Sequence, residues 1–393
     1  MAKEKLNIPI AKTEFNKEDF QAQVKPLKSG WIVQGPYVKE FEDKWNSFSG
    51  ANHSIATTSC TSALHMSLIA LDLKEEDEVI VPAFTWISSA NVVEHIKAKV
   101  VFCDIDIKSF NINYKKLESL ISAKTKAIIP VHLFGLSADM DPILNIAKKN
   151  KLFIVEDAAC GFNSTYKNQH VGTIGDTGCF SFHPRKAITT GEGGIVTTNN
   201  QELAIRLRSL RDHGAAMTDL QRHHGNKPYL LPDFPYAGYN YRMTDIQASI
   251  GCTQMARATE IGQKRKDIAI LYDEKMSEVD WLLHPKYSND FGHGYQSYVC
   301  LFRPEAITIE NISKVNLMRN KFMEYLHENG ISTRPGTHAV HMLDYYKNKY
   351  NVNPEDYLNA YIADQCSISF PLYPTLSNEE LEYILDHISK YNL

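Results

Sequence analysis

A lysine and an aspartate follow two short apolar segments, in positions from which parallel strands present reactive side chains. Lys186 comes after residues 178–183 (GCFSFH), and Asp157 closes residues 152–157 (LFIVED). Each also has an ordinary interpretation, because most lysines are exposed and an aspartate after a strand often caps the next turn. Together, an amine and a carboxylate at the rim of one sheet match a pair that enzymes dependent on pyridoxal 5'-phosphate (PLP) use.

In PLP chemistry the two side chains have separate tasks. The lysine amine forms an imine with the aldehyde of PLP, and the carboxylate pairs with the pyridine nitrogen. A carboxylate about 4 Å from a pyridinium stabilises it by on the order of 4 kcal/mol at an effective dielectric of 20, so the ring stays protonated and withdraws electrons. The freed lysine then acts as general base. Lys186 and Asp157 are therefore the predicted catalytic residues.

The cofactor phosphate needs hydrogen-bond donors, which a helix start supplies through free backbone N–H groups and the helix dipole. The sequence SCTSALHMSL after residue 58 predicts such a start, so the backbone at Cys60 and Thr61 is a candidate phosphate site. Hydroxyl residues at this position are often only caps. Ser181 is a second candidate. Trp86, at the end of VPAFTW, either stacks on the pyridine ring or packs in the core.

Composition excludes several classes of function. The chain has 42 basic and 46 acidic residues, a net charge of -4 without a basic segment, so no nucleic-acid surface is expected. Its seven cysteines contain no CxxC pair, which favours neither disulfides nor zinc, and no metal is predicted. No segment reaches the roughly 18 apolar residues of a membrane span, and no signal peptide is evident. We expect a soluble, cytoplasmic protein.

Short β-rich segments alternate with helical patterns from about residue 54 to residue 200. This alternation predicts a mainly parallel sheet with helices on both faces, and ligands in such sheets bind beyond the carboxyl ends of the strands. Beyond residue 255 a long charged helix, a strand and two more helices predict a smaller α+β domain. We therefore predict a large α/β domain over residues 1–255 and a small domain over residues 256–393.

Four segments, SGWIVQGPYVKEFE, VEDAA, SFHPRKAITTGEGG and GYNYRMTDIQA, resemble the DegT/DnrJ/EryC1/StrS family of PLP-dependent nucleotide-sugar aminotransferases. They follow the order and spacing of that family from about Gly30 to the C-terminus. The resemblance implies the aspartate aminotransferase fold, PLP fold type I, with a seven-stranded type of sheet. It also implies PLP as the cofactor.

The resemblance assigns a role to most of the candidate residues. Lys186 becomes the Schiff-base lysine and Asp157 the partner of the pyridine nitrogen. The phosphate ligands become Ser181 and the backbone at Cys60 and Thr61, and Trp86 stacks on the ring.

Other residues match positions near the substrate or the neighbouring subunit. Asn240 matches an asparagine that reaches the cofactor phosphate of the neighbouring subunit, which implies a homodimer with shared active sites. Arg334 and His338 lie in a segment that approaches the sugar in the family, with a surface loop whose histidines have other partners as the alternative. His183 is a further substrate-binding candidate, with a structural role in the turn as the alternative, and His132 is expected to be structural.

Two positions depart from the family. Cys60 stands where a glycine is usual in the phosphate turn, a residue suited to close backbone approach. Cys160 stands where glutamine or histidine is usual, so the phenolic oxygen of the cofactor would need another strong donor. The resemblance nevertheless includes Cys160 among the cofactor-binding positions.

The TTGEGG form after the lysine is typical of members that aminate C4 of the sugar. The resemblance therefore implies transfer of an amino group from L-glutamate to the 4-keto group of a nucleotide-linked deoxysugar, for surface polysaccharide or glycoconjugate synthesis. The alternatives are a C3-keto-sugar or cyclitol aminotransferase of the same family, and a non-catalytic PLP-binding regulatory protein. A DNA-binding regulator would need a further basic helix-turn-helix module.

Overall fold

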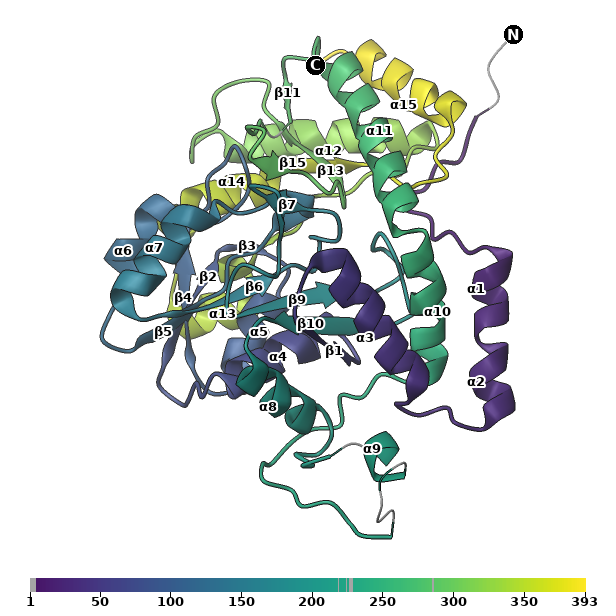
Figure 1. Ribbon diagram of the computed structural model, residues 1–393. Helices are drawn as coiled ribbons and strands as arrows, with labels where there is room; N and C mark the ends of the chain where they lie inside the picture. Colours follow the sequence, from purple (N-terminus) through teal and green to yellow (C-terminus); the bar gives the residue numbers. More distant parts are fainter. Residues whose placement is uncertain (1–4, 218, 224, 226–228, 285) are drawn as a thin grey trace.

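A seven-stranded sheet forms the centre of the molecule (Figure 1). Its strands are β1 (His53–Thr57), β2 (Glu78–Pro82), β4 (Lys99–Cys103), β5 (Thr125–Ile128), β6 (Phe153–Asp157), β9 (Thr177–Ser181) and β10 (Gly194–Thr198). They lie in the order β1-β10-β9-β6-β5-β2-β4. The computed structural model describes residues 5–217, 219–223, 225, 229–284 and 286–393.

Neighbouring strands from β9 through β6, β5 and β2 to β4 run parallel. In contrast, β10 pairs antiparallel with both β9 and β1. Parallel strands are covered on both faces and therefore read as continuous apolar segments. Strand β2, for example, is buried along its whole length. This arrangement confirms the predicted α/β class with a mainly parallel sheet.

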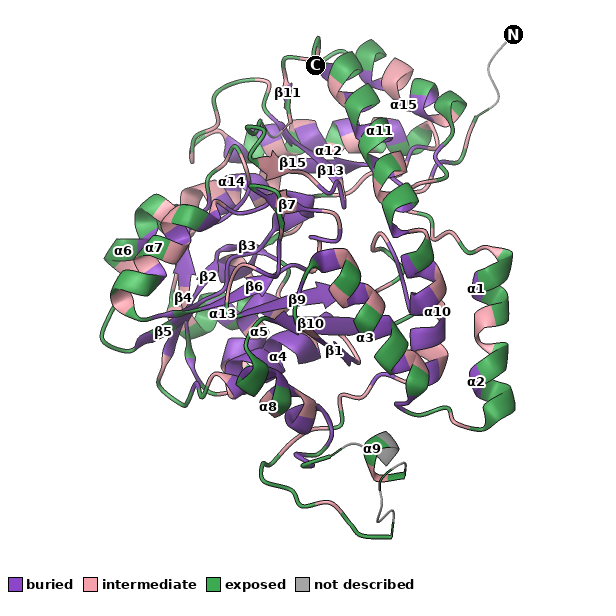
Figure 2. Cartoon of the chain, in the orientation of Figure 1, coloured by how far each residue is buried: buried purple, intermediate pink, exposed green. Residues whose placement is uncertain are grey.

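Successive side chains of a strand point to opposite faces of the sheet, and each face packs against its own helices. Ile55 and Val155 pack with the side that carries α4 (Cys60–Ala70), α5 (Ser88–His95) and α8 (Gln201–Arg211). Ala56 and Ile154 pack with the side that carries α3 (Pro36–Ser49), α7 (Met140–Asn150) and α10 (Asp245–Ala256). Figure 2 shows the resulting pattern, with a buried sheet and helices that are exposed on their outer sides.

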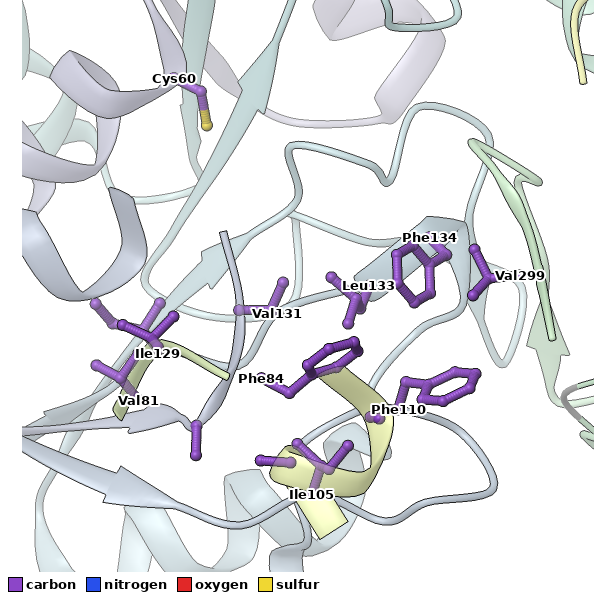
Figure 3. Packing of buried hydrophobic residues seen from close by; sticks show 14 of the residues in the cluster. Cys60, Val81, Phe84, Ile105, Phe110, Ile129, Val131, Leu133, Phe134 and Val299 are labelled. Atoms are coloured by element: carbon purple, nitrogen blue, oxygen red, sulfur yellow. The ribbon is translucent and has the colours of Figure 1, made fainter. Parts of the chain in front are cut away.

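A smaller antiparallel sheet follows, with the order β11-β13-β15. Its strands and helices are β11 (Leu282–Leu283), β13 (Tyr298–Phe302), β15 (Ser367–Phe370), α11 (Ala258–Met276), α12 (Ile312–Glu328), α14 (Leu358–Cys366) and α15 (Asn378–Lys390). Val299 of β13 packs beside Phe134 of the large sheet's rim, and Phe134 also contacts the rings of Phe84 and Phe110 (Figure 3). One apolar cluster therefore joins the two sheets.

The chain passes between the two parts more than once. β14 (His338–Ala339) pairs with β3 (Phe84–Thr85), and Ile8 forms a bridge with Ile331. Helix α11 begins three residues after the predicted boundary at residue 255, and the division into two domains stays a prediction.

Shorter elements connect these parts. They are α1 (Lys17–Ala22), α2 (Val24–Ser29), α6 (Leu117–Leu120), α9 (Asp219–His223), α13 (Asp344–Tyr350), β7 (Thr165–Tyr166), β8 (Gln169–His170) and β12 (Phe291–Gly292). Within the described part of the chain, no helix is both long and apolar enough to cross a membrane.

Glu156, a fully buried carboxylate on β6, fixes the strand that ends at Asp157. It accepts hydrogen bonds from His132 Nε2 at 2.9 Å and from the backbone N–H groups of Gly172, Ile174 and Gly175 at 2.7 to 2.8 Å. Burial alone would raise the pKa of Glu156, but the hydrogen bonds from His132 and the backbone hold it below its ordinary value. His132 is thus structural, as expected.

We expect Glu156→Gln to lower the free energy of unfolding by about 3 kcal/mol at neutral pH, because it breaks a buried, charged hydrogen-bond network. Since the folded state lowers the pKa of Glu156, its stabilisation is present above the ordinary value of 4.5 and is lost as the pH falls further. Urea denaturation over a pH series should show the difference from wild type shrinking below that value. The exposed Glu382→Gln serves as the control. A difference independent of pH would contradict the assignment.

Candidate active site

The carboxyl ends of β6 and β9 lie side by side, so Asp157 and Ser181 share one rim of the sheet. The two strands are parallel, with Asp157 opposite Cys179. Lys186 returns to the same rim, because its Nζ donates a hydrogen bond to Sγ of Cys160 at 3.2 Å. The structure therefore brings the predicted amine to the segment that follows the predicted carboxylate, at one edge of the sheet.

Asp157 is a buried carboxylate, with 4% of its surface exposed. Oδ2 accepts a hydrogen bond from Ser89 Oγ at 2.6 Å, and Oδ1 accepts one from the backbone N–H of Ala159 at 3.1 Å. No described side chain forms an ion pair with it. A buried carboxylate with only neutral donors is unfavourable, so a cationic ligand would stabilise this position.

The loop that carries Lys186 is closed by its own hydroxyl groups. Thr189 Oγ1 donates to the carbonyl of Phe182 at 2.8 Å, and Thr190 Oγ1 donates to the carbonyl of Glu192 at 2.8 Å. The N–H of Lys186 donates to the carbonyl of His183 at 2.8 Å. The hydroxyl groups of these threonines are used in bonds within the turn. Lys186 is therefore the candidate reactive group of the loop.

Helix α4 begins at the same rim with a capping box. Ser59 Oγ accepts from the N–H of Ser62, and Ser62 Oγ accepts from the N–H of Ser59. The N–H groups of Cys60 and Thr61, in the first turn, have no partner within the helix and suit a phosphate. The Cys60 side chain is buried in the main apolar cluster, and burial, followed by the nearby Asp157 carboxylate, raises the pKa of its thiol (Figure 3). The departure from glycine thus leaves the backbone donors in place.

Gly194, the last residue of TTGEGG, passes directly against this helix start. A Cβ at Gly194 would lie 2.3 Å from the carbonyl carbon of Ser59 and 2.5 Å from the backbone nitrogen of Cys60. The close packing of β10 on the turn therefore requires a residue without a side chain.

We expect Gly194→Ala to displace the turn, to lower the free energy of unfolding by about 2 kcal/mol and to weaken PLP binding about tenfold. The matched control is Gly191→Ala, where a Cβ meets no atom within 4 Å and only the φ of 85° causes strain. Urea denaturation and PLP titration separate the two effects. Equal PLP affinity in Gly194→Ala and wild type would contradict the role assigned to this contact.

Trp86 and His338 lie together at the edge of the rim. The tryptophan is 59% exposed, which excludes the core alternative, and its ring centroid is 5.9 Å from that of His338. Their backbones are held close because His338 pairs with Thr85 and Thr337 Oγ1 donates to the carbonyl of Thr85. Residues 337–338 therefore lie beside Trp86, and their approach to the sugar stays a prediction.

Arg334, Ser181 and His183 flank the lysine loop. Burial lowers the pKa of Arg334, and the adjacent guanidinium of Arg185 lowers it further, so two cationic groups stand near the lysine. The N–H of His183 donates to Ser181 Oγ at 3.4 Å. His183 Nδ1 accepts from the N–H of Arg185 at 3.2 Å, which is a contact within the turn.

Asn240 stands apart from this group of residues. It is exposed and forms a bridge with Asp212, and none of its described contacts is with the lysine loop. Tyr239 and Tyr241 on either side stack at 5.1 Å, and Tyr241 hydrogen-bonds to His65 at 3.1 Å. The tyrosines anchor the segment and leave Asn240 facing outward.

Sequence reasoning missed Ser89 and Gln296. Ser89 lies three residues after Trp86, in the first turn of α5, so its place after a strand end was a usable signal. Gln296 contacts both peptides beside Lys186, but it lies more than a hundred residues away in the sequence, and no local pattern indicates it.

The residues at the rim fit PLP. Four features match four parts of that cofactor. Among the described residues, a lysine amine suits the aldehyde, a buried carboxylate without a cationic partner suits the pyridinium, the N–H groups of a helix start suit the phosphate, and an exposed indole suits the ring face. With the fold described above, they define a PLP enzyme of fold type I.

The chain belongs to the DegT/DnrJ/EryC1/StrS aminotransferase family, whose model matches residues 13–389. The spore coat polysaccharide biosynthesis protein SpsC of Bacillus subtilis is 33% identical and covers 97% of this chain and 96% of its own. A GDP-perosamine synthase of Escherichia coli O157:H7 is 34% identical over 98% of both chains. The PLP form of Spr1654 from Streptococcus pneumoniae superposes with a TM-score of 0.89, at 29% identity, over 98% of this chain and 97% of that one. The protein is a PLP-dependent sugar aminotransferase.

Proposed function

We propose that the enzyme transfers the amino group of L-glutamate to the 4-keto group of a nucleotide-linked deoxysugar, for the synthesis of surface polysaccharide or a glycoconjugate. The observation that carries the proposal is that the Lys186 amine lies at the same rim as the buried Asp157 carboxylate, with which no described side chain forms an ion pair. The similarity to a GDP-perosamine synthase and to SpsC supports a nucleotide sugar as the acceptor. The TTGEGG form of residues 189–194 favours C4.

In this proposal Lys186 holds the cofactor covalently and moves protons. PLP, when bound, supplies an electron-withdrawing ring that stabilises negative charge at the reacting carbon. The freed Nζ would take the proton from the α-carbon of glutamate and deliver it to the cofactor carbon that bears the transferred nitrogen. Water would supply the keto oxygen of the departing 2-oxoglutarate, and with the keto sugar Nζ would move a proton in the reverse direction as water is released. Cys160 Sγ accepts a hydrogen bond from Nζ and thereby directs the amine along the rim.

The other rim residues hold the cofactor. Asp157, oriented by Ser89, supplies the negative charge that faces the pyridine nitrogen. The N–H groups of Cys60 and Thr61, with Ser181 Oγ, bind the phosphate, because together they offer uncommitted donors at the positive end of α4.

The side of the rim at Trp86 binds the ring and the substrates. The exposed indole stacks on the cofactor. Arg334 and Arg185 form a cationic pair for the carboxylates of glutamate or for the sugar's diphosphate, because both substrates are anionic. His338, beside the indole, lies on the side from which the substrates enter. His183 holds the shape of the lysine turn.

We further propose that two copies share their active sites, with Asn240 of each reaching the phosphate site of the other. Its outward orientation supports this, as do exposed apolar side chains on the N-terminal segment and the segment before Asn240: Phe15, Phe20, Val24, Leu27, Ile32, Val33, Tyr229, Leu230, Leu231 and Phe234. Such a set of exposed apolar groups is typical of a protein interface. The unpaired thiols of all seven cysteines suit a reducing cytoplasm.

The test is a panel of UDP-, GDP- and dTDP-linked 4-keto sugars, with a nucleotide-linked 3-keto sugar and a keto cyclitol alongside, incubated with PLP-loaded protein and ¹⁵N-labelled glutamate. The proposal predicts a labelled aminosugar by mass spectrometry, with nitrogen at C4 by NMR. Amination only of a 3-keto sugar or a cyclitol would favour the alternative specificity. Bound PLP without any loss of label from glutamate would favour a regulatory protein and contradict the proposal.

A further inference from the structure

The amide of Gln296 contacts the two peptides that flank Lys186. Its Nε2 donates to the carbonyl of Arg185 at 2.7 Å, and its Oε1 accepts from the N–H of Ala187 at 3.1 Å. A primary amide offers one donor and one acceptor side by side, as a neighbouring strand would. Gln296 is buried, so water does not compete for these bonds.

A buried arginine holds the backbone of Gln296 from the α11 side. Arg265 Nη2 donates to the carbonyl of Gln296 at 2.6 Å and to that of Leu372 at 3.2 Å, and its Nε donates to the carbonyl of Tyr295 at 3.0 Å. The guanidinium is 3% exposed, and no described carboxylate pairs with it. Burial lowers the pKa of Arg265 to about 10, so it stays charged at neutral pH. The three hydrogen bonds that Arg265 donates here all go to backbone carbonyl groups.

A turn at the rim of the large sheet holds the same segment from the other side. The N–H of Gly294 donates to the carbonyl of Gly135 at 2.8 Å, and the N–H of Ser297 donates to that of Phe134 at 3.2 Å. A Cβ at Gly135, which has a φ of 100°, would lie 2.8 Å from the backbone nitrogen of Gln296. The segment carrying Gln296 therefore has little room to move.

We propose that Gln296 is a positioning residue for Lys186, which fixes the lysine loop to the junction of the two sheets so that Nζ points along the rim. Gln296 bonds the peptides on both sides of the lysine and not the amine itself, so it acts through the loop. The inference rests on the proposed function of Lys186. A displacement of about 1 Å in a reacting group can reduce the rate about a hundredfold.

The test compares Gln296→Met, which removes both hydrogen bonds at similar length, with Gln296→Glu, which retains the acceptor for the N–H of Ala187. The matched control is Asn316→Met, which removes the amide's hydrogen bond to the carbonyl of Gln365 and the one that it accepts from Asn320, both within the smaller part. All proteins are loaded with PLP. We expect kcat of Gln296→Met to fall about 30-fold with KM changed less than about threefold, and Gln296→Glu to retain more activity.

A second readout needs no substrate. Hydrogen exchange should accelerate about fivefold at the Ala187 amide in Gln296→Met, but not in Gln296→Glu or Asn316→Met. The pH at which the absorbance of the lysine-bound cofactor titrates should also shift in Gln296→Met. These readouts separate this inference from the proposed function, because they hold even if no sugar of the panel is aminated. Wild-type exchange and wild-type titration in Gln296→Met, or equal changes in Asn316→Met, would overturn it.

Discussion

Lys186→Ala is expected to reduce amino transfer by at least about 10⁴-fold, because one atom, Nζ, is both the attachment point of the cofactor and the carrier of the proton. Lys186→Arg is expected to be equally inactive, since a guanidinium keeps the charge but stays protonated and does not form the covalent bond. The measurement is the single-turnover rate of glutamate deamination by PLP-loaded protein.

The exposed Lys126→Ala on β5 is the matched control and should keep full activity. The fold should tolerate the loss of the Lys186 side chain, because its amine contacts Cys160 through a single hydrogen bond. Addition of ethylamine should restore part of the rate in Lys186→Ala by replacing the proton carrier. Normal turnover in either Lys186 variant would contradict the assignment.

Asp157→Asn is expected to reduce the rate about 10³-fold, because loss of a charge interaction on the order of 4 kcal/mol corresponds to nearly three powers of ten. The amide oxygen still accepts the hydrogen bond of Ser89, so the local structure should persist. PLP affinity should fall less than the rate. Single-turnover kinetics and PLP titration give the two quantities.

Ser89→Ala separates the charge of Asp157 from its orientation. It removes one hydrogen bond, at 2.6 Å, and keeps the carboxylate group itself, so a loss of about tenfold is expected. The account is wrong about Asp157 if Ser89→Ala is as severe as Asp157→Asn, or if Asp157→Asn stays within about tenfold of wild type.

The order of strands and helices in the large sheet could be predicted, because it follows from the apolar pattern within each segment. Alternating apolar strands and helices require a covered parallel sheet. Asp157 is the last residue of β6, and Lys186 lies in the loop after β9, which ends at Ser181. The antiparallel pairing of β10 with β1 and β9, and the return of residues 338–339 to β3, depend on contacts between distant segments.

In the site too, features that depend on contacts between distant segments could not be predicted from local patterns. The departures at Cys60 and Cys160 were visible in the sequence, but their consequences were not: burial places the Cys60 thiol in the core, and the Cys160 thiol faces the lysine. Gln296 reaches the lysine loop only because Arg265 and the turn at Gly135 hold its backbone, an arrangement without a local signature. The role proposed for Asn240 requires a second copy of the chain, which a single sequence does not reveal.

The central claim, that Lys186 is the residue that holds PLP, is tested most directly by reducing the PLP-loaded protein with borohydride and locating the phosphopyridoxyl group by peptide mass spectrometry. The account predicts a single modified peptide, with the group on Lys186, and no modified peptide in Lys186→Ala. Attachment at another lysine, or the absence of any attachment in protein that has bound PLP, would contradict it.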